Sequence, residues 1–125
     1  MVLDSNILID AARPGGERLA PYLADPEACI SIVSRIEALG YHLLKDEEDA
    51  VIRQSLAGLP ELQLDAEIAE RGIALRRQRR MKLGDAMIAG TALEYEVPLV
   101  TRNVDDFKQV ALLDRINPFA EPESE

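Results

Sequence analysis

Four acidic residues, each beside a short apolar segment, are the part of this sequence most able to do chemistry. They are Asp4, Glu37, Asp85 and Asp106. Carboxylates gathered at one edge of a fold repel one another and lose hydration. A divalent cation relieves both costs, and hard cations such as Mg²⁺ prefer carboxylate oxygens. The set therefore predicts a metal site, and with it the cleavage of phosphodiester bonds.

Short segments rich in Val, Ile and Leu alternate with helix-favouring segments along the chain. The expected strands are residues 2–4, 28–33, 61–64, 97–101 and 112–116. The expected helices are residues 6–12, 17–24, 35–44, 46–56, 66–80 and 85–94, with a turn or short helix at 103–108. This alternation predicts an α/β fold with a mostly parallel sheet. Ligands of such sheets bind beyond the carboxyl ends of the strands, where Asp4, Glu37 and Asp106 are expected.

The composition fits one domain, expected at residues 1–120, with a short acidic tail at 121–125. A chain of 125 residues, 47% of them hydrophobic, can bury a core. No apolar stretch is long enough to span a bilayer, and a first strand at residue 2 leaves no room for a signal peptide. A single cysteine, Cys29, fits a reducing cytosol, and zinc is not expected without a Cys/His cluster. We therefore expect a cytoplasmic protein.

The formal net charge of −9 argues against binding nucleic acid by overall charge, although it does not exclude a metal-dependent nuclease. Basic residues are nevertheless concentrated among residues 76–82. They are Arg76, Arg77, Arg79, Arg80 and Lys82. One interpretation is a solvated helix end, where cations interact favourably with the helix dipole. The other is a contact with a phosphate backbone.

Each acid also has a structural explanation that the sequence leaves open. Ser34 and Glu37 match a helix capping box. Asp85 and Asp106 lie near expected helix starts, where an acidic side chain stabilises the helix. Asp4 lies in a strand-to-helix turn. Two observations weaken these explanations. Asp85 lies in an apolar stretch, and Asp4 ends the strand expected at the centre of the sheet, where an unpaired buried carboxylate is costly.

Four segments, in order along the chain, resemble the motifs of the PIN domain family. They are residues 4–9, 31–40, 84–92 and 99–107, and residues 116–118 resemble the usual ending. Ser5 stands in the first motif where Thr is usual. The ordered set spans nearly the whole chain. It resembles above all the VapC-type toxins, the ribonuclease halves of bacterial and archaeal toxin–antitoxin pairs.

This resemblance implies a PIN-like three-layer α/β/α sandwich with a central, mostly parallel five-stranded sheet. It also implies a homodimer, inhibition by a cognate antitoxin protein that lies over the acidic cleft, and RNA cleavage with one or two Mg²⁺ or Mn²⁺ ions. Asp4, Glu37 and Asp85 match the family's acids. The fourth motif departs from the fullest pattern, because Asn103 stands where many members carry Asp and only Asp106 keeps the later acid. One ion would then be held firmly and a second only with substrate.

The expected roles follow from metal-assisted hydrolysis, in which a metal-activated water attacks phosphorus in line. Asp4, Asp85 and Asp106 are the expected metal ligands. Glu37 is expected to bind metal through water or to help deprotonate the nucleophile. The residues expected to orient these ligands or to bind a phosphate are Ser5, Asn6, Thr101 and Asn103. Those expected to contact RNA, in a single-stranded loop, are Arg79, Arg80 and Lys82.

Two other functions remain open at this point. A phospho-acceptor receiver domain has a similar length, fold class and magnesium chemistry. It would need an acidic pair after the first strand and a Lys directly after a late one, but Ser5 and Asn6 follow Asp4, and no Lys directly follows Thr101. A PIN-like binding module that has lost catalysis is the second alternative, since fold does not determine function. Magnesium titration distinguishes such a module from an enzyme.

Overall fold

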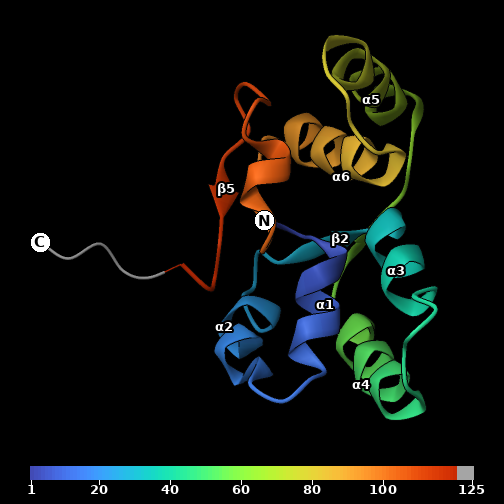
Figure 1. Cartoon of the computed structure of the whole chain (residues 1–125), viewed down its shortest axis with the longest axis vertical. Coiled ribbons are helices and arrows are strands. Elements are labelled where there is room, and N and C mark those ends of the chain that lie inside the picture. The colour runs from blue at the N-terminus through green and yellow to red at the C-terminus, as the bar shows by residue number, and fades with distance from the viewer. Residues whose placement is uncertain (121–125) are drawn as a thin grey trace, which may run out of the picture.

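A central sheet with helices on both sides makes up the computed structural model, which describes residues 1–120 (Figure 1). Within these residues the sheet has five strands in the order β3-β2-β1-β4-β5, and every neighbouring pair is parallel. The strands are β1 (Val2–Leu3), β2 (Cys29–Ser31), β3 (Glu61–Leu62), β4 (Leu99–Val100) and β5 (Arg115–Ile116). The predicted α/β/α sandwich is confirmed. The acidic tail predicted at 121–125 lies outside the described residues.

Six α-helices and two 3₁₀ helices connect the strands within residues 1–120. They are α1 (Ser5–Ala11), η1 (Gly16–Leu19), α2 (Ala20–Leu23), α3 (Ile32–Leu39), α4 (Asp46–Ala57), α5 (Ala66–Gln78), α6 (Leu83–Glu94) and η2 (Val104–Phe107). The helix expected at 17–24 is divided into η1 and α2. Pro21, in the first turn of α2, has no N–H with which to extend the preceding helix. None of these helices is long and apolar enough to cross a membrane.

The helix expected at 35–44 is α3, which begins earlier, at Ile32, because Ser31 rather than Ser34 caps it. It also ends earlier, at Leu39. The Ser31 hydroxyl accepts a hydrogen bond from the amide two residues later at 3.1 Å. Ser34 is buried within α3, and its hydroxyl donates to the carbonyl oxygen of Leu3 at 3.1 Å. The capping box interpretation of Ser34 and Glu37 is therefore wrong. Glu37 lies in the last turn of α3 and takes no part in capping its start.

Each side of the sheet has its own hydrophobic core, because neighbouring residues of a strand face opposite layers. On one side the core includes Leu3, Ile7, Leu8, Ile30, Ile52 and Val100. On the other side it includes Val2, Leu75, Ile88, Ala89, Leu99 and Phe107. Burial of each large aliphatic side chain contributes about 1.5–3 kcal/mol. The first core holds α1 and α4 on one face of the sheet, and the second holds α5 and α6 on the other (Figure 1).

The strand order brings distant parts of the chain to one edge of the sheet. The chain runs from β1 outward through β2 to β3, then crosses over to β4 and β5 on the other side of β1. Leu3 pairs with Val100, so the residues that follow, Asp4 and Thr101, are neighbours although they are far apart in sequence. Ligands of parallel sheets bind at such a change of direction, beyond the carboxyl ends of the strands.

Candidate active site

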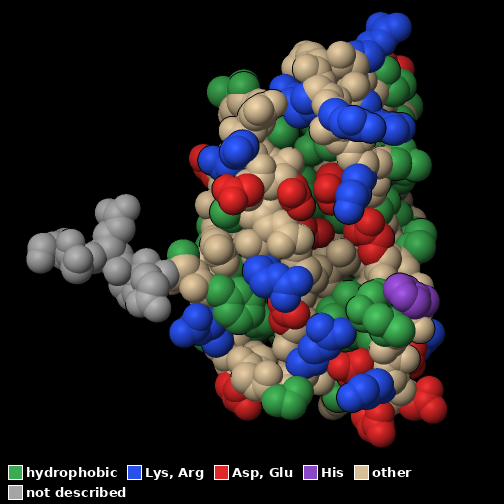
Figure 2. Space-filling view, in the orientation of Figure 1, with side chains coloured by type: hydrophobic (Ala, Val, Ile, Leu, Met, Phe, Trp, Pro, Cys, Tyr) green, Lys and Arg blue, Asp and Glu red, His purple; other side chains and the backbone are tan. Residues whose placement is uncertain are grey.

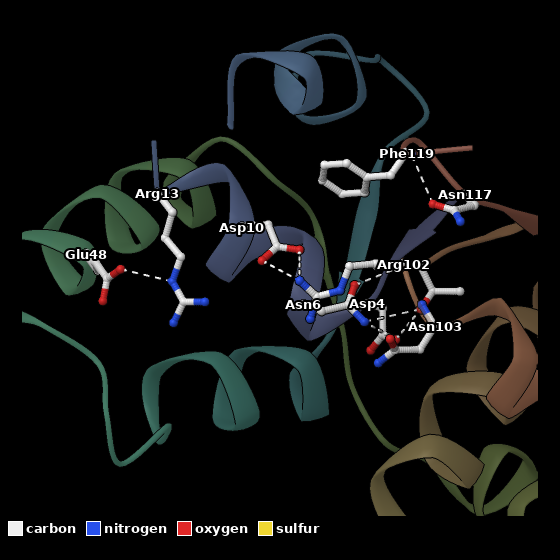
Figure 3. A network of polar contacts seen from close by, with 10 residues as sticks. Asp4, Asn6, Asp10, Arg13, Glu48, Arg102, Asn103, Asn117 and Phe119 are labelled. Atoms are coloured by element: carbon white, nitrogen blue, oxygen red, sulfur yellow. Dashed lines mark hydrogen bonds and ion pairs between the residues drawn. The ribbon is translucent and has the colours of Figure 1, made fainter. Parts of the chain in front are cut away.

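Asp4 is the buried centre of a polar network at this edge of the sheet (Figure 3). Only 3% of the residue is exposed. Its Oδ1 accepts a hydrogen bond from the Ser5 amide at 2.8 Å, and its Oδ2 accepts one from the Thr101 hydroxyl at 2.8 Å. Asn6 Nδ2 donates to the same Oδ2 at 3.3 Å. Asp4 thus does cap α1, as the turn explanation requires, but it is also tied to β4 and its orientation is fixed from two elements.

The pKa of Asp4 is raised above its ordinary value, and burial of the carboxyl group is the largest cause. Hydrogen bonds from Thr101 and Ser5 act in the opposite direction, while the nearby charge of Asp106 raises the pKa further. A buried carboxylate whose hydrogen bonds do not offset its burial is stabilised by a cation.

Glu37 reaches this edge from α3 and lies against the start of α6. A Cβ atom placed on Gly84 would collide with the Glu37 carboxylate, so the absence of a side chain at Gly84 makes room for it. Partial desolvation raises the pKa of Glu37, a hydrogen bond from Ser5 lowers it, and the charges of Asp4 and Asp85 raise it again. Glu37 is exposed, which keeps its carboxylate accessible to a ligand.

Asp85 lies half-buried in the first turn of α6, and Lys82 rather than Asp85 occupies the N-cap position. The pKa of Asp85 is raised to about 6. Desolvation is the largest cause, followed by the charges of Asp4 and Asp106, whereas the charge of Lys82 lowers it. Asp85 therefore feels two other acids that are distant in sequence, an environment unlike that of a simple helix cap.

Asp106 and Asn103 approach from the segment that follows β4. Both are exposed, and the charge of Asp106 acts on Asp4 and Asp85. Asn103 precedes η2 without a capping hydrogen bond from its side chain, and its backbone amide donates to Thr101 Oγ1 at 3.0 Å. Thr101 is thus held by the loop while it donates to Asp4. The charges of Asp4 and Asp106 therefore act on Asp85, and those of Asp4 and Asp85 act on Glu37.

A pocket of about 440 Å³ opens beside these acids, and basic side chains form one wall. Its lining residues are Arg76, Arg80, Met81, Lys82, Asp85 and Asp106. Arg80 and Lys82 line this pocket, and their contact with RNA stays a prediction. Arg79 lines no part of this pocket, because its guanidinium donates to Leu75 O and to Gln78 Oε1 of its own helix. Figure 2 shows acidic side chains in a row across this face, with basic side chains above and below.

Arg76 was not among the predicted contact residues, although it lines the same pocket and its Nε donates to Met81 O at 3.2 Å. The sequence signal was the basic run itself. Which member faces the acids depends on where α5 ends, and it ends at Gln78, two residues earlier than expected. Helical spacing therefore does not continue through residues 79–82.

The donor chemistry at this edge fits a hard divalent cation, since every ionisable donor is a carboxylate and three of them have raised pKa values. Within residues 1–120, no group of three or more His, Cys, Asp or Glu side chains is arranged so that it could hold a metal ion. Metal binding by Asp4, Asp85 and Asp106 therefore stays a prediction. What the structure adds is that Asp85 and Asp106 line one pocket from separate elements, and that the charges of both Asp4 and Asp106 raise the pKa of Asp85.

The PIN domain family model matches residues 1–113 of this chain. The chain belongs to the PIN domain family. A toxin–antitoxin complex from Klebsiella pneumoniae contains a chain with 29% identity, a TM-score of 0.73, and coverage of 94% of this chain and 97% of that one. No curated protein matches.

Two VapBC structures share the fold at lower identity. VapBC2 from Rickettsia felis, bound to a promoter DNA fragment, is 19% identical with a TM-score of 0.77, covering 91% of this chain and 95% of that chain. DNA-bound VapBC from Salmonella typhimurium is 22% identical with a TM-score of 0.76, covering 91% and 94%. The predicted membership is confirmed, and the receiver-domain alternative is set aside. PIN domains are in general nucleases.

Proposed function

We propose that this PIN domain protein is a divalent-metal-dependent endoribonuclease and the toxin component of a toxin–antitoxin pair. The observation that carries the proposal is the coupling of Asp4, Glu37, Asp85 and Asp106. These carboxylates come from four separate segments. Asp4 accepts a hydrogen bond from Thr101 of the neighbouring strand end, Glu37 lies against Gly84, and Asp85 and Asp106 line one pocket. The charges of Asp4 and Asp106 raise the pKa of Asp85, and those of Asp4 and Asp85 raise the pKa of Glu37. Acids paired only within their own helices would not show this mutual effect.

Asp4, Asp85 and Asp106 would hold the ion, which when bound would activate water and neutralise charge that develops on the phosphate. Thr101 and Asn6 keep Asp4 in one orientation through hydrogen bonds to its Oδ2. Ser5 lies between Asp4 and Glu37, with hydrogen bonds that act on both carboxylates. Glu37, exposed and with a raised pKa, is suited to accept a proton from the attacking water.

The substrate we propose is single-stranded RNA, in a loop or a free end. Bases in an A-form duplex are hidden in a deep, narrow major groove, whereas an unpaired strand can enter a shallow pocket. Arg76, Arg80 and Lys82 line the pocket beside Asp85 and would neutralise the phosphates that approach the acids. Asn103, exposed at the same edge, would contact a phosphate.

An antitoxin partner is supported by the Klebsiella pneumoniae neighbour, which is described as a toxin–antitoxin complex. We propose that a segment of such a partner covers the acidic pocket. A homodimer remains a prediction from the resemblance, and a cytoplasmic location remains a prediction from the composition. Light scattering on the purified protein, alone and with the protein encoded next to it, tests both assemblies.

Cleavage of an RNA panel tests the proposed function. Wild-type protein with Mg²⁺ is expected to cut at least one structured RNA, and EDTA is expected to stop the reaction. Asp4→Asn is expected to lose nearly all activity. Asp105→Asn is the matched control, because Asp105 is an exposed acid next to Asp106 that has no assigned role. Equal cleavage by wild type and Asp4→Asn contradicts the assignment of this site.

A binding module without catalysis is the alternative function. Magnesium titration by calorimetry separates the module from the enzyme. Absence of both magnesium binding and cleavage favours the module.

A further inference from the structure

A second polar hollow lies next to the acidic edge, on the side of the sheet covered by α1 and α4. Two pockets, of about 180 and 420 Å³, share Asp10, Arg13 and Arg102 in their walls. The smaller pocket also contains Asn6, the residue that donates to Asp4. The hollow is therefore adjacent to the acids but has a different composition, with two arginines as its central feature.

Arg102 is held in one orientation by two neighbours. Its Nη1 donates to both carboxylate oxygens of Asp10, at 2.9 and 2.7 Å (Figure 3). Its backbone amide donates to Asn6 Oδ1 at 3.2 Å. Nε and Nη2 take no part in the pair with Asp10, so they remain as donors for a ligand in the hollow.

Arg13 has a comparable arrangement at the end of α1. Its Nε donates to Glu48 Oε2 of α4 at 3.1 Å, which leaves both terminal nitrogens outside the pair. The guanidinium carbon lies 5.8 Å from the centre of the Tyr41 ring. Both arginines thus line the shared hollow, and each has guanidinium nitrogens outside its carboxylate pair.

These ion pairs orient the arginines more than they stabilise the fold. The side chains of Arg102 and Arg13 are 48% and 39% exposed. Surface ion pairs with that exposure contribute little to stability. A planar guanidinium with donors to spare matches the oxygens of a phosphate group. Orientation before binding lowers the entropy lost when a phosphate is bound.

We propose that Arg13 and Arg102 form a phosphate-binding subsite for the RNA strand, a proposal that rests on the proposed ribonuclease function. The strand would cross the acids from the pocket of Arg76, Arg80 and Lys82 on the α5 and α6 side to this hollow on the α1 and α4 side. Figure 2 shows basic side chains on both sides of the acidic row, as this path requires. The competing explanation is that the two pairs only fasten α1 to α4 and to the loop after β4.

Salt-dependent RNA binding separates these explanations. The probe is a fluorescein-labelled single-stranded RNA of mixed sequence, about 12 nucleotides long, which suits a single binding groove. Anisotropy is measured on proteins that carry Asp4→Asn, in EDTA, so that the strand is not cut. Arg13→Gln and Arg102→Gln are added singly and together. The matched control is Arg53→Gln, because Arg53 Nε makes the same kind of pair with Asp49 at 3.0 Å on α4.

Each substitution in the hollow is expected to weaken binding about fivefold to tenfold and to reduce the slope of log Kd against log salt by about 1. Arg53→Gln is expected to change neither. With Mg²⁺ and Asp4 intact, the double variant is expected to raise KM while kcat stays within about twofold. Thermal melting checks that all variants fold.

The possible results separate this proposal from the proposed function. If the double variant binds RNA as tightly as Arg53→Gln with the same salt slope, the subsite is overturned even where wild type cleaves RNA. If binding depends on both arginines but wild type cuts no RNA with Mg²⁺, the subsite stands and the nuclease assignment fails. If the parent protein does not bind the strand, the subsite is overturned.

Discussion

Carboxylates on the two sides of α1 have opposite surroundings. On the α4 side, Glu48 accepts hydrogen bonds from the Lys45 amide at 2.9 Å and from Arg13, and these bonds hold its pKa below the ordinary value. At the sheet edge, the pKa of Asp85 is raised to about 6 by desolvation and by neighbouring acids. The chain thus supplies partners for the carboxylate that stabilises the fold. At the sheet edge, the charged neighbours that raise the pKa of Asp85 are other carboxylates.

The comparison teaches where to look for a ligand. An acid with an arginine and an amide already has its charge compensated, so a cation adds little. Acids that raise one another's pKa are poised to gain from any divalent ion that replaces their protons. Four predictions, ordered from the largest expected effect to the smallest, test whether this difference is real.

Asp85→Asn is expected to reduce RNA cleavage roughly 100-fold or more, because it removes a ligand and an electrostatic contribution made in the transition state. The comparison variant is Glu94→Gln, at the other end of the same helix, where Arg71 Nε donates to Glu94 at 2.6 Å. Single-turnover rates with Mg²⁺ measure both. A similar loss in the two variants would contradict the distinction between paired and unpaired acids.

Gly84→Ala is expected to lower cleavage about tenfold with little change in stability. The added Cβ meets the Glu37 carboxylate, which is the far end of a flexible side chain and can move away. Displacement of about 1 Å in a catalytic group costs up to about 100-fold in rate. Gly58→Ala is the control, since a Cβ there meets its nearest atom only at 3.8 Å. Unchanged cleavage by Gly84→Ala would contradict a role for Glu37 in the reaction.

The stability of the protein in EDTA is expected to fall as the pH rises from about 4 to about 6. Asp85 ionises near its ordinary 3.8 in the unfolded chain but near 6 in the folded one, so the unfolded state loses its proton first. Asp85→Asn should flatten this slope and raise the free energy of unfolding at pH 7 by about 1 kcal/mol, after allowance for solvent screening. Urea denaturation at several pH values measures it. A slope unchanged by the substitution would contradict the raised pKa.

Glu48→Gln is expected to have the smallest effect and the opposite pH dependence. The folded pKa of Glu48 is lowered, so its contribution is present above the ordinary value of 4.5 and is lost as the pH falls through the folded pKa. The substitution should lower Tm at pH 7 and leave the single-turnover rate at saturating RNA unchanged. Glu47→Gln, an exposed neighbour in the same helical turn, should lower Tm less. Equal Tm shifts in the two variants would contradict a stabilising role for the pair of Glu48 with Arg13.

The proximity of the acids could be predicted from sequence because it depends on topology. Asp4, Glu37 and Asp106 each follow a strand, and parallel strands end at one edge. The first strand was expected at the centre of the sheet, where β1 lies. Asp85 needed the resemblance as well, since nothing in its own segment connects it with β1.

Contacts between distant side chains could not be predicted. The hydrogen bond from Ser34 to Leu3 O, which moves the start of α3, depends on how a helix packs against the end of a strand. The pair of Arg102 with Asp10 joins residues 92 positions apart. Local propensity carries no information about such partners, and the same limit applies to which basic residues of 76–82 face the acids.

A crystal structure with Mn²⁺ is the most direct measurement of the central claim. We expect anomalous density at the carboxyl edge of the sheet, bound by Asp4 and Asp85 at about 2.1–2.2 Å, with Asp106 bound directly or through water. Density that is absent at saturating Mn²⁺, or that lies away from these carboxylates while RNA is still cleaved, would contradict it.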